Sequence, residues 1–168
     1  TNDNSDNLSG AFRLDYHLDD DTTIRGFARY FRSNVSLVNL SNFAEAIDPN
    51  GHQREEFMLF NGAIEHRFNE HLSVRANAYF VRDDVRLNDL PEPSYPSTQI
   101  ARIPDEIRGG DTEAVYTWVP SWRTVIGFDF KDRWARTYDL FAFPGFASLT
   151  IFRARRQEYA GYGGQEGS

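Results

Sequence analysis

The residues best suited to hold a ligand are aromatic side chains in segments without strand alternation. Phe141, Phe143 and Phe146 fall in one predicted loop, and Tyr95 falls in a second, proline-rich loop. Exposed loop aromatics can grip a hydrophobic or planar ligand. These four residues are therefore the candidate ligand-binding residues, although packing of the loops or contact with membrane lipid would explain them equally well.

No group of residues selects an enzymatic reaction. The chain has no cysteine, which excludes disulfides and cysteine-based zinc sites. His66 and His71 flank a predicted turn at a spacing that does not suit a metal on a strand, and Asp19, Asp20 and Asp21 form a hairpin tip that water would solvate. We expect no catalytic residues, no metal site and no cofactor, and hence no enzyme.

The composition of the chain narrows the classes of molecule that it could bind. The chain of 168 residues carries a formal net charge of −7, and its mean hydropathy is −0.59. Arginines supply nearly all the positive charge and are spread along the chain, with Lys131 the only lysine. An acidic chain without a basic stripe argues against a nucleic-acid partner. No run approaches the ~20 apolar residues of a membrane helix.

The clearest structural signal lies in residues 72–80, where apolar and polar residues alternate strictly. Leu72, Val74 and Ala76 fall on one side of an extended chain, whereas Ser73 and Arg75 fall on the other. This period of two is typical of a β-strand with two different faces.

The same alternation predicts about seven strands joined alternately by tight turns and long segments. Apparent changes of parity after Ser33 and at Asp83–Asp84 suggest bulges. Gly109 and Gly110 read as turn or strand-end glycines. The strands are expected at about 7–18, from 22 onward, and at 56–68, 72–87, 111–119, 122–130 (extending as far as 138) and 150–162. The long segments are expected at 39–54, 88–110 and 139–149.

This rhythm is typical of an antiparallel up-and-down transmembrane β-barrel, in which short turns lie at one end and long loops at the other. Runs of about eleven residues suit a tilted bilayer crossing, which takes ~9–11 residues. Seven strands cannot close alone, because single-chain bacterial barrels have an even number from eight upward. We therefore expect residues 1–168 to form a partial outer-membrane barrel domain within a larger barrel.

Three stretches resemble the β-domain of TonB-dependent outer-membrane receptors. They are LSGAFRLDYHLDDDTTI at residues 8–24, AIEHRFNEHLSV at 63–74 and RQEYAGYG at 156–163. The resemblance implies a bacterial outer-membrane location and active uptake of a scarce nutrient, such as a ferric siderophore or a corrinoid. It also implies contact with lipid and lipopolysaccharide, and coupling to a TonB-type protein through a plug domain, which this sequence does not show.

Other functions remain open at this point. The barrel segment could be passive and porin-like, or a structural subunit that contacts other envelope proteins. A soluble β-sandwich binding module would also alternate apolar and polar residues, although its long and short connections need not separate by end.

Overall fold

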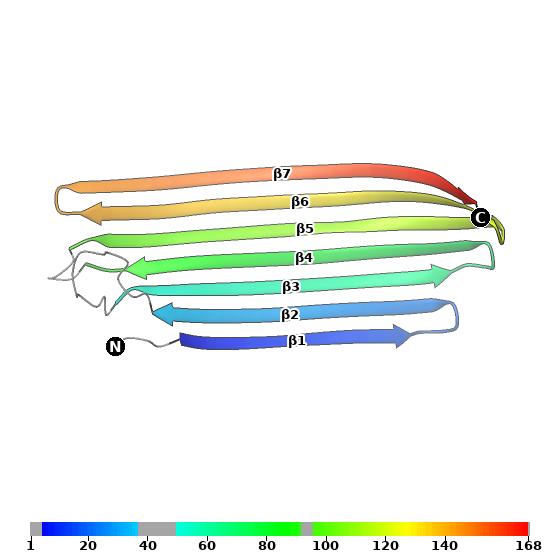
Figure 1. Ribbon diagram of the computed structural model, residues 1–168, viewed down its shortest axis with the longest axis horizontal. Helices are drawn as coiled ribbons and strands as arrows, with labels where there is room; N and C mark the ends of the chain where they lie inside the picture. The colour runs from blue at the N-terminus through cyan, green and yellow to red at the C-terminus, as the bar shows by residue number, and fades with distance from the viewer. Residues whose placement is uncertain (1–4, 37–49, 92–95, 168) are drawn as a thin grey trace.

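A computed structural model describes residues 5–36, 50–91 and 96–167 of the chain, and the regular structure in these ranges is entirely β-strand. One sheet holds all seven strands in chain order, and each pair of neighbours is antiparallel (Figure 1). The strands are β1 (Ser5–His17), β2 (Thr22–Ser36), β3 (His52–Arg67), β4 (Leu72–Asp89), β5 (Thr98–Val119), β6 (Trp122–Phe143) and β7 (Phe146–Gly167).

The predicted all-β, antiparallel, seven-stranded arrangement is thus confirmed. Within the described residues the sheet is open, because β1 and β7 are its edges and do not pair with each other. None of the described residues forms a helix long and apolar enough to cross a membrane.

The sheet is a single layer without a hydrophobic core in the described ranges. No hydrophobic side chain there is buried, and Phe12 and Ile126 are each 63% exposed. A soluble sheet normally covers at least one face with a second sheet or with helices. The apolar surface of this sheet is therefore left for something outside the described chain to cover.

The register assigns every residue to one of two faces. Partners across each ladder share a face, so Ile24, Ile64, Ala76, Thr112 and Phe128 lie side by side. We call this the belt face, and the other the opposite face. The belt face consists of the even-numbered residues of β1–β6 and the odd-numbered residues of β7.

A continuous apolar belt covers the belt face toward the end with the β1–β2, β3–β4 and β5–β6 turns. It contains no Asp, Glu, Lys, Arg or His, although 26% of the whole chain is charged. Such segregation is what apolar surroundings would require. The belt comprises the even-numbered residues of 8–16, 24–30, 58–64, 72–80, 110–116 and 124–130, and the odd-numbered residues of 159–163.

The upper edge of the belt, which is the edge farther from the β1–β2, β3–β4 and β5–β6 turns, runs obliquely to the strands. The row of paired residues that contains Tyr159, the uppermost belt residue of β7, reaches Leu14 on β1. On β1 the belt continues upward beyond Leu14 as far as Leu8. That offset of six residues over six strand spacings corresponds to a tilt of about 35° between the strands and the normal to the belt edge. The lower edge follows the same slant, because successive short turns are displaced in the same direction.

Above the belt the two faces exchange character. The belt face becomes charged, while the opposite face gains apolar residues such as Phe57, Val81, Val85 and Ile107. This exchange explains the parity changes that suggested bulges near Ser33 and Asp83–Asp84. That prediction was wrong, since both ladders are continuous there, and the one register shift in the described ladders lies between Thr117 and Val119.

Two predicted long loops are largely strand. β5 begins at Thr98 and not near residue 111, and it accommodates Pro104 where the β5–β6 ladder skips Ile103 and Pro104. The segment 139–149 is also not a long loop. β6 continues to Phe143, and β7 begins at Phe146 after a turn at Pro144-Gly145, where Gly145 has φ of 87°.

Gly109 and Gly110 lie in the middle of β5 and not at a strand end. A Cβ on Gly110 would come within 2.5 Å of the Asn77 carbonyl oxygen, and one on Gly109 would meet the Tyr79 ring at 2.5 Å. Tyr162 covers Gly127 in the same way, so that a Cβ on Gly127 would overlap the tyrosine ring. Tyrosine rings packed over strand glycines hold neighbouring strands in register on the opposite face.

Candidate functional site

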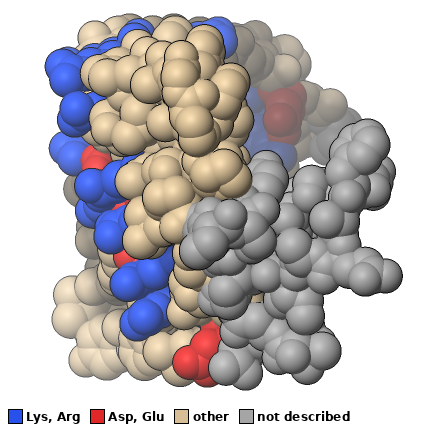
Figure 2. Space-filling model, turned by 90° about the vertical axis from the view of Figure 1, so that its left-hand side faces the viewer, with Lys and Arg blue, Asp and Glu red and all other residues tan. Residues whose placement is uncertain are grey.

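Directly above the belt, the belt face carries a concentration of arginines. Figure 2, viewed along the strands from the end where β2 leads into β3, shows Lys and Arg side chains gathered down one side of the sheet. By register this upper zone holds nine arginines and five acidic residues. They are Arg32, Arg54, Arg82, Arg86, Arg102, Arg108, Arg136, Arg153 and Arg155, with Asp6, Glu56, Asp84, Glu106 and Asp132. We call these residues the arginine zone.

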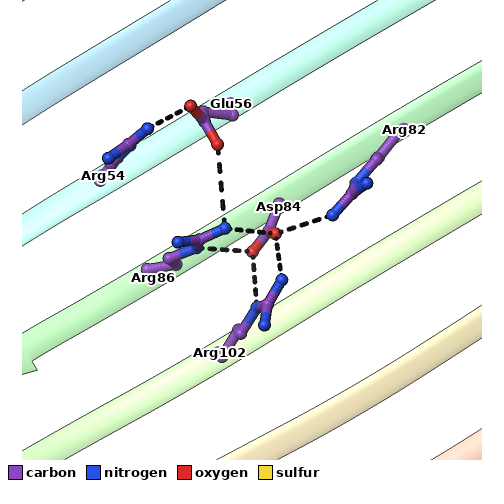
Figure 3. Close-up of polar contacts among 6 residues, drawn as sticks. All are labelled: Arg54, Glu56, Arg82, Asp84, Arg86 and Arg102. Carbon is purple, nitrogen blue, oxygen red and sulfur yellow. Dashed lines mark hydrogen bonds and ion pairs between the residues drawn. The ribbon is translucent and has the colours of Figure 1, made fainter.

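Asp84 is the centre of the arginine zone. Its side chain is 1% exposed, and three arginines from β4 and β5 converge on it (Figure 3). Arg102 donates from Nη2 to Oδ2 at 2.7 Å, Arg86 at 3.0 Å and Arg82 at 3.3 Å. Arg86 also lies 3.8 Å from Glu56, which pairs with Arg54 on β3. The network therefore ties β3, β4 and β5 together just above the belt.

Asp84 remains ionised because its neighbours outweigh its burial. Burial disfavours the carboxylate, but the hydrogen bonds from Arg102 and Arg86 hold the pKa of this carboxyl well below its usual range. Asp84 lies above the belt and serves as a fixed negative anchor for three positive side chains. The guanidinium groups are thus positioned rather than free to swing, although Arg102 and Arg86 stay nearly half exposed.

Two grooves open in the arginine zone on either side of Trp134. One, of about 300 Å³, is lined by Arg82, Arg102, Arg136 and Tyr138. The other, of about 620 Å³, lies toward β7. Glu106 and Trp134 line both grooves, and the second groove also includes Arg108, Asp132, Arg153 and Arg155.

At the height of the belt, the opposite face carries charged and amide side chains, several of which pair with one another. Arg25 contacts Glu65 at 3.2 Å and Asp15 at 3.8 Å. Further along the sheet, Asn77 donates to Asp111 at 2.9 Å and accepts from Asn61 at 2.9 Å. Tyr162 donates to Glu113 at 3.0 Å. Charged and amide side chains at this height are therefore confined to one side of the strands, the side opposite the belt.

Three of the four predicted ligand-binding aromatics meet at the β6–β7 hairpin. The ring centroids of Phe143 and Phe146 are 5.1 Å apart in a stacked arrangement, and those of Phe141 and Phe143 are 5.9 Å apart. All three lie on the opposite face, each more than one third exposed. Tyr95 lies outside the described residues. The three rings form an apolar tip, and in the described part of the chain no polar group converges on it that would orient a ligand.

Sequence reasoning missed the arginine zone. Its members come from all seven strands and are separated by many residues in the chain, so no local motif marks them. The one local signal is the alternation of charged residues at 82, 84 and 86 in continuation of the apolar 72–80 run, which keeps the same face. Comparisons with protein-family models, curated proteins and solved structures find no match for this chain.

Proposed function

We propose that this chain forms part of the wall of a transmembrane β-barrel in a bacterial outer membrane, with the belt face against lipid and the opposite face toward a wet lumen. The single observation that carries this proposal is the uncharged belt with parallel, oblique edges. On β4 the belt runs from Leu72 to Phe80, about 27 Å along the strand. At a tilt of about 35° this projects to about 22 Å, close to the ~25 Å apolar band of outer-membrane barrels.

The opposite face is consistent with the same assignment. Arg25, Glu65 and Asn77 lie there at belt height, and such polar side chains suit a water-filled or protein-filled lumen. A soluble sandwich would instead bury the belt against a second layer.

Cysteine labelling tests the placement, because the native chain has no cysteine. Ala76→Cys lies in the belt, and Ala63→Cys lies on the opposite face of the neighbouring strand. In bilayers, a lipid-soluble quencher should reach a fluorophore on Ala76→Cys, while a water-soluble maleimide should modify only Ala63→Cys. Equal modification of both positions by the water-soluble reagent would exclude the proposed orientation.

We further propose that the barrel is a receptor of the TonB-dependent kind, which takes up a scarce nutrient such as a ferric siderophore or a corrinoid. The three stretches that resemble this family support the proposal, and the exposed Phe141, Phe143 and Phe146 suit capture of a planar or apolar ligand. A TonB-type protein would supply energy through a plug domain.

Uptake measurements test the transport proposal. Cells whose growth depends on the candidate nutrient should lose high-affinity uptake when the gene is deleted, and a protonophore should abolish the uptake that the gene restores. Restored uptake that persists with the protonophore would indicate a passive porin. Unchanged uptake after deletion, with the protein still in the membrane of the parent strain, would favour a structural role in an envelope assembly.

A further inference from the structure

Above the belt, two carboxylates on the opposite face each have an oxygen that no group in the described chain satisfies. Oδ1 of Asp83 on β4 and Oδ1 of Asp139 on β6 are both buried and accept no hydrogen bond from the described residues. Asp105, directly across from Asp83, is bound by Arg133 through hydrogen bonds of 3.2 and 2.6 Å. That guanidinium is therefore already engaged, and the charge of Asp83 is left without a partner.

The surroundings of Asp83 are largely apolar. Val81 and Val85 flank it on the same face of β4, Phe57 lies directly across on β3, and Ile107 pairs with Val81 from β5. Burial and the neighbouring carboxylates raise the pKa of Asp83. A carboxylate oxygen held among apolar side chains without a donor is unfavourable, so a cation that covered it would be bound with a gain in free energy.

The two carboxylates are too far apart for one small cation. Through the β4–β5 and β5–β6 ladders, Asp83 lies level with Ala135, four residues from Asp139 on β6. Two strand spacings and a rise of four residues separate the two acids by about 16 Å. Ile103 of β5 lies between them, and Phe141 follows Asp139 on the same face. A ligand that engages both acids must therefore be elongated and carry apolar groups between its cationic ones.

We propose that this surface binds an extended peptide whose lysine or arginine side chains reach Asp83 and Asp139 and whose apolar side chains cover the residues between them. An ammonium or guanidinium group would supply the missing donors through charge-assisted hydrogen bonds. The rings of Phe141, Phe143 and Phe146 extend the same apolar surface toward the β6–β7 turn. A simple polyamine would match the charges but would leave the apolar residues uncovered. The inference rests on the proposed receptor function and assigns a ligand class to it.

Asp83 should oppose folding while it supports binding. Its unpartnered charge is unfavourable in the free protein, so Asp83→Asn should not lower the stability of the sheet. The same substitution should weaken binding of a cationic peptide. A residue with a purely structural role would not show these two effects in opposite directions, and residues that weaken the fold are common at functional sites.

The test uses the protein in phosphatidylcholine nanodiscs and a short fluorescent peptide with blocked ends. Leucine and lysine alternate with serine in it, so that its two lysines are four positions and about 13 Å apart in an extended chain. Fluorescence anisotropy measures binding of this peptide and of an analogue with glutamine in place of lysine. We expect at least tenfold preference for the lysine peptide, lost in the double variant Asp83→Asn/Asp139→Asn.

The matched control is Asp20→Asn/Glu70→Gln. It removes the same charge from exposed side chains in the short turns at the far end of the sheet and should leave the preference unchanged. Because both double variants change the net charge equally, the comparison separates binding at this surface from general attraction to an acidic protein. Circular dichroism of each variant confirms that the sheet is intact.

Three results would overturn the inference. These are equal affinity for the lysine and glutamine peptides, an equal loss in the control variant, or full displacement by millimolar spermidine, which would indicate a site for free polyamines. Uptake that depends on the gene, without binding of the lysine peptide, would reject this inference alone. Peptide binding that depends on Asp83 and Asp139, with uptake unchanged by deletion of the gene, would support the site and reject the transport proposal.

Discussion

Ala76→Arg is expected to destabilise the protein in bilayers by about 2–4 kcal/mol, because the proposed orientation would place an arginine at this position against lipid near the bilayer midplane. Ala76 is the central belt residue of β4, four residues from each end of that strand's share of the belt. Among the described residues, nothing on the belt face at this height could pair with the new charge. Urea unfolding in bilayers, followed by tryptophan fluorescence, measures the change.

The matched control is Ala160→Arg. Ala160 lies on the opposite face and pairs directly with Asp129, so the new guanidinium would gain a carboxylate neighbour in a wet setting. We expect its unfolding free energy to stay within about 0.5 kcal/mol of the wild type. If Ala160→Arg proved as damaging as Ala76→Arg, the difference between the two faces would not be one of lipid and water.

The second large effect on the free energy of unfolding is expected at Asp84. It is tested by comparing substitutions of two adjacent residues. Asp84→Asn removes the negative charge shared by Arg82, Arg86 and Arg102 and replaces one of its two acceptor oxygens with an N–H donor. It should cost about 2–3 kcal/mol, moderated because the arginines keep access to water. Asp83 lies above the belt on the opposite face, directly across from Asp105, and its Oδ1 has no hydrogen-bond partner among the described residues. Asp83→Asn should therefore be neutral or stabilising.

The dependence of these two variants on pH follows from opposite pKa shifts. The lowered pKa of Asp84 means that its stabilisation is fully present above the ordinary carboxyl pKa of about 3.9 and is lost only as pH falls through the lower folded value. Burial, with Asp105 and Asp84 nearby, raises the pKa of Asp83. Its unfavourable charge is relieved as pH falls, so any gain from Asp83→Asn should shrink toward acid pH, while the loss from Asp84→Asn persists. Unfolding at pH 7 and pH 5 separates the two.

The sequence was sufficient for the strand alternation within the belt. Residues 72–80 alternate without exception, and the structure places Leu72, Val74 and Ala76 on one uncovered face. The antiparallel order also followed from the short turns near Asp20, Glu70 and Ser121, since strands joined by a few residues must lie side by side.

Prediction failed where strands continue beyond the belt. The bulge at Asp83–Asp84 was predicted on the assumption that each face keeps one polarity along its whole length. The ladder there is regular, and it is the polarity of the two faces that changes. Pro104 indicated a loop, because proline cannot donate to a ladder. The strand β5 nevertheless includes Pro104, at a gap in the β5–β6 ladder. The network around Asp84 was beyond local reasoning, because Arg102 approaches it from another strand and only the register brings the two together.

One consequence follows from the pairing of every strand with its immediate neighbours in the chain. No strand must wait for a distant segment before it can dock, so the sheet can grow by successive addition of hairpins, each presenting a finished edge to the next. Gain or loss of a complete hairpin would leave the registers of the remaining ladders unaltered. Such a sheet can gain or lose width during evolution without redesign of its surfaces.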